Sequence, residues 1–155
     1  MMQVQIKANT LNVKNELKRI TRKRKSAIDK ALNKVSNMAI FMITKRTQSG
    51  NLPDGGKMLP YAKSTVKSRK KRGRQTGFVD LTDSKKMFRS LDYKVSGLKS
   101  SLFFRGQDQN KIASYHDIFG AGKSKTIRPF FSIGDKEEDK IKKEFASTFF
   151  KELKI

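Results

Sequence analysis

The chain has 155 residues, 35% of them apolar, which is enough for one hydrophobic core and too few for two. It has no cysteine and one histidine, which excludes disulfides, thiolate zinc sites and a cysteine nucleophile, and we expect no metal and no cofactor. Lys and Arg (36) outnumber Asp and Glu (14), for a net charge of +22, and residues 1–75 alone hold 20 basic and 3 acidic residues. This excess favours an anionic partner: nucleic acid, an acidic protein or an anionic membrane surface.

Apolar runs in this sequence are short. The longest is Met38–Ile43, whereas a bilayer crossing needs roughly 18–20 apolar residues. The first residues are polar and lack the apolar centre of a signal peptide. We therefore expect a protein that is made and kept in the host cytoplasm, without a membrane partner.

The first third of the chain predicts a short strand and then a long helix. Residues 3–8 alternate polar and apolar side chains, as a half-buried strand does. From Leu11, apolar residues recur every three or four positions, which predicts a core-facing helix that ends before Gly50. Four consecutive cations at residues 22–25 mark a possible break. A membrane-surface helix is the weaker interpretation, because no aromatic anchors lie on its early part. The face opposite the apolar stripe is basic: Lys14, Lys18, Arg22, Lys25 and Lys30.

The middle of the chain predicts loops and short helices. Residues 48–62 contain prolines and glycines that exclude a helix. A short helix is expected from Ser64 to about Lys71. A second short helix is expected to run to Leu91, with Asp80 or Thr82 as its N-cap.

The last third predicts strands followed by a helix. Residues 93–95 and 101–104 suggest two strands with a turn around Gly97, and residues 110–119 suggest a helix that Gly120 ends. Residues 126–133 suggest a strand, with Pro129 at an edge or bulge.

The most secure helix begins at Asp135, with Glu138 at a capping-box spacing. The pattern as a whole predicts an α+β fold in which a long N-terminal helix and a C-terminal helix pack on a small, mainly antiparallel β-sheet. Residues 1–155 are expected to form a single domain.

Three signals look like chemistry, and each has a simpler explanation. Gly122-Lys123-Ser124 matches the end of a P-loop, but the earlier glycine of that motif is Asp117, so a small polar turn is predicted. His116 is adjacent to Asp117, and adjacent residues do not face each other on a helix or strand. The acidic run 137–139 fits helix capping better than a two-metal site. We therefore predict no catalytic residue.

The densest charge is the basic loop at about 63–77. It suits contact with phosphates or with an acidic protein better than reading of bases, and a mobile, solvated loop is the plain alternative. The candidate contact residues for DNA or an acidic partner are Lys63, Lys67, Arg69, Lys70, Lys71, Arg72 and Arg74.

The order of these motifs resembles the phage virion morphogenesis proteins of the Mu G-like type, also called tail completion or head–tail joining (neck) proteins. The resemblance runs from about Met38 to Phe149. It is carried by Pro53-Asp54-Gly55-Gly56 with Leu59-Pro60-Tyr61, by Leu81-Thr82-Asp83-Ser84 with Ser90-Leu91, by Ala113–Gly120, and by Ile127-Arg128-Pro129-Phe130-Phe131. The residues that match the family motifs in structural positions are Tyr115, His116, Gly120, Arg128, Pro129 and Phe130.

This resemblance implies a structural virion protein of the tail or neck, without enzymatic activity. It implies a ring, hexameric or larger, that contacts other tail, neck or connector proteins. The basic loop is then expected to face genomic DNA in the channel or an acidic neighbour. The sequence departs from the family pattern at Lys85, at Phe119 and at Thr126. A non-catalytic, sequence-independent nucleic-acid-binding protein is the alternative, and a phage nuclease is a third reading.

Overall fold

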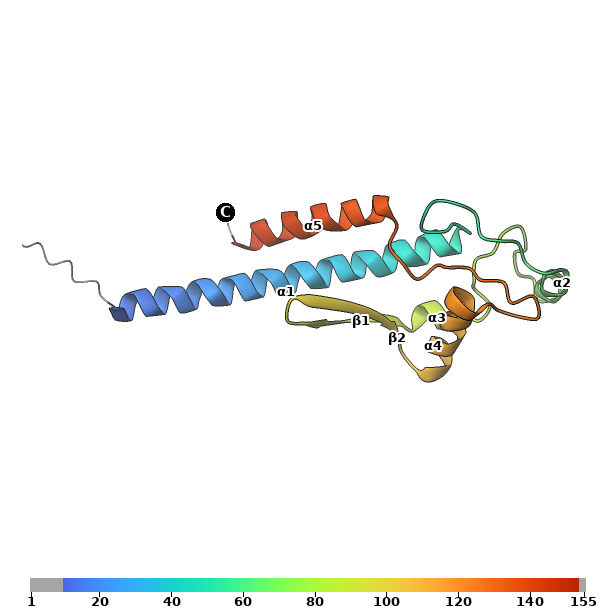
Figure 1. The fold of residues 1–155 in the computed structure, drawn as a ribbon, viewed down its shortest axis with the longest axis horizontal. Coiled ribbons are helices and arrows are strands. Elements are labelled where there is room, and N and C mark those ends of the chain that lie inside the picture. Colours follow the sequence, from blue (N-terminus) through green and yellow to red (C-terminus); the bar gives the residue numbers. More distant parts are fainter. Residues whose placement is uncertain (1–9, 154–155) are drawn as a thin grey trace, which may run out of the picture.

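Residues 10–153 are described by a computed structural model, with side chains from residue 14 onward. They form an α+β fold of five α-helices and one antiparallel hairpin, which confirms the predicted class. Helix α1 (Thr10–Gln48) runs along the middle of an elongated molecule (Figure 1). Helix α5 (Asp135–Leu153) lies along one side of it, and the hairpin of β1 (Leu91–Ser96) and β2 (Lys99–Phe104) lies along the other. The strand predicted at residues 3–8 falls outside the described residues.

Helix α1 is continuous, so the possible break at residues 22–25 is wrong. Consecutive side chains point to different sides of a helix, and Lys and Arg are good helix formers, so the four cations do not interrupt it. Residues 14–26 are all exposed. The buried stripe of α1 begins only after them and comprises Ala27, Ala31, Val35, Ala39 and Ile43.

Helices α1 and α5 pack antiparallel along this stripe. Three ion pairs link them: Lys30 to Glu152 at 2.5 Å, Lys34 to Glu144 at 2.6 Å, and Arg46 to Glu137. The cap of α5 lies one residue earlier than predicted, because the carboxylate of Glu137 accepts a hydrogen bond from the N–H of Gly134 at 3.0 Å. That contact is half of a capping box, in which the side chain at the third helical position reaches back.

Phe130 lies at the centre of the hydrophobic core and is fully buried. Its ring meets Phe88 edge-to-face at 5.8 Å between centroids and Phe104 at 6.2 Å. Phe88 belongs to the short helix α3 (Lys86–Arg89) and Phe104 to β2, so one aromatic side chain joins three parts of the chain. Truncating such a residue to alanine costs about 3–5 kcal/mol.

The strand predicted over residues 126–133 is wrong. Burial does alternate there, since Arg128 and Phe130 are buried and Pro129 is exposed. Apart from an isolated bridge between Ala121 and Thr126, however, no strand within residues 10–153 pairs with it. The N–H groups of Phe130 and Phe131 both donate to the carboxylate of Asp117, at 2.7 and 2.8 Å. The period-2 signal is therefore real, but side-chain and loop acceptors replace a β-ladder.

The helix cap predicted at Asp80 or Thr82 is also wrong, because α3 begins after Lys85, which adopts a left-handed conformation (φ +62°). The other predicted elements are confirmed. The 64–71 helix is α2 (Lys63–Lys71), and the hairpin turns at Gly97. The 110–119 helix is α4 (Gln107–Ser114) continued by a π-helical turn, η1 (Tyr115–Phe119), which ends at Gly120.

Candidate functional site

The lysines of the basic loop share one exposed face of α2. Lys63, Lys67, Lys70 and Lys71 are all exposed, and their spacing of four, seven and eight residues gathers them on one side of a helix. Residues 63–71 of the basic segment therefore form a helix, and residues 72–77 form a turn and a loop after it. Four amines on one face, without base-reading geometry, suit contact with phosphates or with an acidic surface.

Arg69 is not part of that face, which corrects its prediction as a contact residue. Its side chain is buried and donates two hydrogen bonds to the carboxylate of Asp80, both at 3.0 Å. It also donates to the carbonyl oxygens of Gln75 and Thr82, and its guanidinium lies 4.6 Å from the centre of the Tyr61 ring. Arg69 thus fixes α2 to the loop that follows it.

The surroundings of Asp80 keep its carboxylate charged, so that it can pair with Arg69. Burial alone would raise the pKa of Asp80, but hydrogen bonds from Gln75, Thr82 and Tyr61 outweigh it and hold that pKa below its usual 3.8. Burial raises the pKa of Tyr61, so its hydroxyl stays protonated and donates to Asp80 at 2.8 Å. The carboxylate therefore stays charged beneath the lysine face at neutral pH.

Arg72 and Arg74 lie at the end of α2 and share one carboxylate. Arg72 approaches Asp83 at 2.6 Å and Arg74 approaches it at 3.4 Å. The hydrogen bond from Arg72 lowers the pKa of Asp83. Arg72 and Asp83 are both exposed, so their pair is weak and a phosphate can compete for Arg72, whereas Arg74 is half-buried.

Of the residues predicted to be structural, Arg128, His116 and Gly120 are held by contacts between loops, whereas Tyr115 and Pro129 are exposed. Arg128 is buried and donates to the carbonyls of Leu59 at 3.1 Å and Pro60 at 3.0 Å, while its own N–H donates to the carbonyl of His116 at 2.7 Å. Gly120 has φ +84°, and a Cβ there would lie 2.1 Å from the carbonyl oxygen of Lys125. These contacts lock the η1 turn onto the 127–131 segment.

The Gly-Lys-Ser segment forms a small turn, as predicted. Ala121 donates its N–H to the carbonyl of Thr126 at 3.1 Å, and Lys125 donates to that of Gly122 at 3.2 Å. No helix follows it within the described residues until Asp135, so the segment lacks the strand–loop–helix context of a P-loop.

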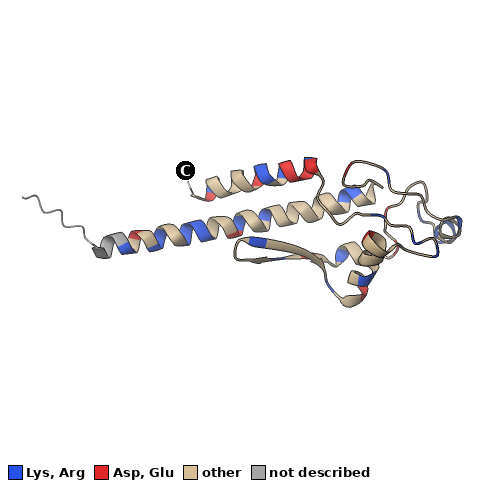
Figure 2. Ribbon diagram, viewed as in Figure 1, with Lys and Arg blue, Asp and Glu red and all other residues tan. Residues whose placement is uncertain are grey.

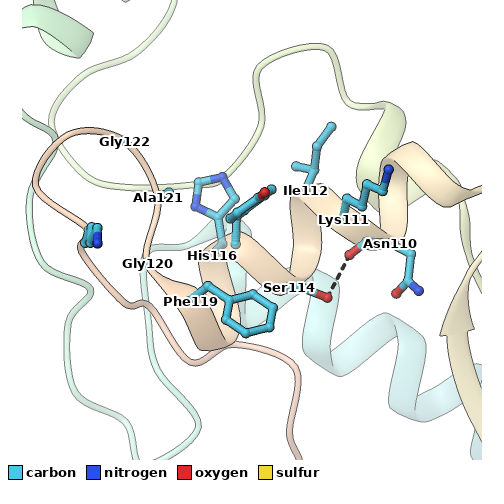
Figure 3. A pocket seen from close by; sticks show the side chains of 11 residues that line it. Asn110, Lys111, Ile112, Ser114, His116, Phe119, Gly120, Ala121 and Gly122 are labelled. Atoms are coloured by element: carbon cyan, nitrogen blue, oxygen red, sulfur yellow. Dashed lines mark hydrogen bonds between the residues drawn. The ribbon is translucent and has the colours of Figure 1, made fainter.

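A pocket of about 1000 Å³ opens beside this turn and is lined by α4, η1 and residues 120–125 (Figure 3). Burial lowers the pKa of His116, and the charge of Arg128 lowers it further, so the imidazole is neutral at pH 7. Its Nδ1 has no hydrogen-bond partner among the described residues. The lining residues include the amines of Lys111 and Lys125 but no carboxylate.

Large apolar side chains are exposed on the same two elements. The helix α4 and the turn η1 present Ile112, Tyr115, Ile118 and Phe119, the last two 59% and 64% exposed. We call these four residues the η1 patch. Sequence reasoning missed this patch, because apolar residues three and seven positions apart predict a core face equally well.

Sequence reasoning also did not identify a second basic surface as a candidate site. Residues 14–26 of α1 protrude beyond α5 and the hairpin, and Lys and Arg are frequent along them (Figure 2). These charges are visible in the sequence, but only the structure shows that nothing among the described residues covers them.

Within residues 10–153 no group of three or more His, Cys, Asp or Glu side chains is arranged to hold a metal ion. No helix in that range combines the length and apolar character that a bilayer crossing needs. Comparison with known proteins finds no matching family model, no matching curated protein and no matching solved structure.

Proposed function

We propose that this chain is a structural virion protein of a tailed phage or prophage, which completes the tail or joins head to tail as a subunit of a ring. It would stay in the host cytoplasm until assembly. The observation that carries the proposal is the η1 patch, because a monomeric protein rarely exposes several neighbouring large apolar residues without a partner for them. The kind of assembly that we propose, a ring in the tail or neck, comes from the resemblance of the motifs to the Mu G-like family.

A second copy of the chain is the occupant that charge favours for the η1 patch. Lys111 and Lys125 border the patch, and the first five residues of α5 include the exposed acids Asp135, Glu138 and Asp139. Residues 76–155 carry 16 basic and 11 acidic residues, so contacts within this half avoid most of the repulsion of a +22 chain. A contact between two different surfaces of one subunit generates a ring when the rotation closes.

The lysine face of α2 has a separate role in this proposal. It faces either the channel, where genomic DNA passes, or an acidic neighbouring virion protein. Its amines would bind phosphates without reading sequence, since no side chain there is held for base contact.

The test is the mass of the purified protein by light scattering, at several concentrations and without nucleic acid. The unaltered chain should form discrete oligomers, and Phe119→Ser should dissociate them. Leu98→Ser is the matched control, because Leu98 is 76% exposed at the tip of the hairpin, outside the patch. A chain that stays monomeric at every concentration, or virions that mature without it, would contradict the proposal.

A non-catalytic nucleic-acid-binding protein is the second candidate, and the lysine face of α2 favours it. Such a protein would be a monomer or dimer with a steep salt dependence of duplex affinity. Replacing Lys63, Lys67, Lys70 and Lys71 with glutamine would then abolish most of its binding, whereas a ring subunit would keep its oligomeric mass.

A further inference from the structure

We propose that residues 14–26 of α1, which we call the α1 arm, form a separate surface that binds the phosphate backbone of duplex DNA without reading its sequence. This inference does not depend on the ring. The arm and α2 lie at opposite ends of the molecule, so they cannot contact the same phosphates (Figures 1 and 2).

Seven of the 13 residues of the arm are basic. Every residue from 14 to 26 is exposed. Glu16 is its one acidic residue and pairs with Arg19 at 2.8 Å. The remaining cations have no ion-pair partner among the described side chains; they are Lys14, Lys18, Arg22, Lys23, Arg24 and Lys25.

The cations lie on several sides of the helix. At 3.6 residues per turn, Lys14, Lys18, Arg22 and Lys25 fall within about 80° of one another and extend over about 16 Å. Arg19 and Lys23 lie on a second side, and Arg24 lies on a third. The major groove of DNA is about 12 Å wide and admits an α-helix, and phosphates form both of its walls. A helix with cations on more than one side matches that surrounding charge.

The other anionic partners match the arm less well. A membrane-surface helix needs a broad apolar face with aromatic anchors, and the described part of the arm offers only Leu17 and Ile20. Docking on an acidic protein surface would use one side of the helix and leave the cations of the other sides unpaired. Duplex DNA is therefore the partner that uses the most of this charge.

Repulsion between cations within the arm allows a second test of DNA binding, separate from affinity measurements. Lys14, Lys18 and Arg22 are four residues apart, and like charges at that spacing destabilise a helix. Phosphates that neutralise them should stabilise the helix, so DNA binding should slow amide hydrogen exchange in residues 14–26 of the full chain.

The experiment compares three full-length proteins for binding to a fluorescent duplex of about 25 base pairs over a range of salt concentrations. The arm variant carries Lys14→Gln, Lys18→Gln, Arg22→Gln and Lys25→Gln. The control carries Lys136→Gln, Lys140→Gln, Lys143→Gln and Lys151→Gln, four exposed α5 lysines outside any ion pair that the structure describes. Both variants have the same net charge, and circular dichroism checks that both fold.

We expect the arm variant to lose at least tenfold in affinity, and the slope of log affinity against log salt to fall by about 3–4. The control should lose much less, and a duplex of unrelated sequence should bind equally well. The duplex should slow amide exchange in the arm of the unaltered protein.

Three outcomes would overturn the inference. The first is equal loss of affinity in both variants. The second is exchange protection that maps to α2 instead of the arm. The third is tighter binding, at the same salt, to polyglutamate or to phosphatidylserine vesicles than to DNA. Light scattering of the arm variant keeps this result distinct from the ring proposal, which predicts unchanged oligomeric mass.

Discussion

Arg69 is the cation of the basic segment whose charge is used inside the protein. It lies between exposed lysines in the sequence, yet its guanidinium is buried against Asp80. Removing one partner of a buried ion pair leaves an uncompensated charge and costs about 3–5 kcal/mol. Arg69→Ala should lower the free energy of unfolding in urea by about that amount, whereas Arg72→Ala, at the exposed Asp83 pair, should cost at most about 1 kcal/mol. Equal losses would mean that the Arg69 pair is not structural.

The sequence held a partial signal for this arginine. On a helix over residues 63–71, Arg69 falls on the side opposite the four lysines, near Val66. Its acceptor, however, is a carboxylate eleven residues away in a loop, and sequence spacing does not reveal such a contact. The same holds for Arg128, whose acceptors are the carbonyls of Leu59 and Pro60.

His116 should make stability depend on pH, because its pKa in the folded state is lowered from the usual 6.5. Burial, and then the charge of Arg128, lower its pKa in the folded state, so the unfolded chain takes up a proton more readily. The contribution of the buried, neutral His116 to the free energy of unfolding is fully present above the unfolded pKa of 6.5. It declines as the pH falls below that value. In His116→Gln, which does not titrate, unfolding free energies measured at pH 7.5 and 5.5 should differ less. Identical pH dependence in both proteins would show that His116 is not the group involved.

At the scale of the elements, Glu137 joins the start of α5 to the end of α1. Its carboxylate accepts hydrogen bonds from the guanidinium of Arg46 and from the N–H of Gly134. Hydrogen bonds to charged groups contribute about 1.5–3 kcal/mol, so Glu137→Gln should lower unfolding stability by about that much. Glu138→Gln is the control, since Glu138 is exposed and pairs only with Lys142 four residues on. A smaller loss at Glu137 than at Glu138 would contradict this role.

Elements with a strong local period were predictable and elements defined by distant partners were not. The apolar repeats of α5 and of α1 from Ala27 onward, and the hairpin around Gly97, are local signals, and each was confirmed. The start of the α1 repeat was wrong as a core face, because Leu17 and Ile20 are exposed. The 126–133 segment shows a strand period because Arg128 and Phe130 are both buried, but a strand also needs a neighbour. Its neighbour is the side chain of Asp117, which no periodicity encodes.

At the scale of the whole molecule, the charge of +22 is itself a destabilising force. Salt screens such repulsion, with a Debye length that falls from about 10 Å at 0.1 M to about 3 Å at 1 M. The midpoint of thermal unfolding should therefore rise as sodium chloride is added. The four-lysine α5 variant, with four fewer charges, should show a smaller rise. A midpoint that falls with salt would mean that attractive ion pairs outweigh the repulsion.

The candidate surfaces could be identified only from the three-dimensional structure. The charges of residues 14–25 and the apolar residues of 112–119 are plain in the sequence. Whether such residues face a core, a partner or solvent depends on which elements cover them. The sequence therefore predicted that an anionic partner exists, but not that two basic surfaces stand at opposite ends.

Because α1 is one unbroken helix, it fixes the distance and the rotation of the arm relative to the rest of the molecule. Adding seven helix-forming residues after Ser26 would move the arm outward by about 10 Å and rotate it by only about 20°. Adding five would move it about 7.5 Å but swing its lysine row by about 140°. If the arm binds DNA in a fixed orientation relative to the rest of the molecule, the seven-residue insertion should lower DNA affinity less than the five-residue insertion.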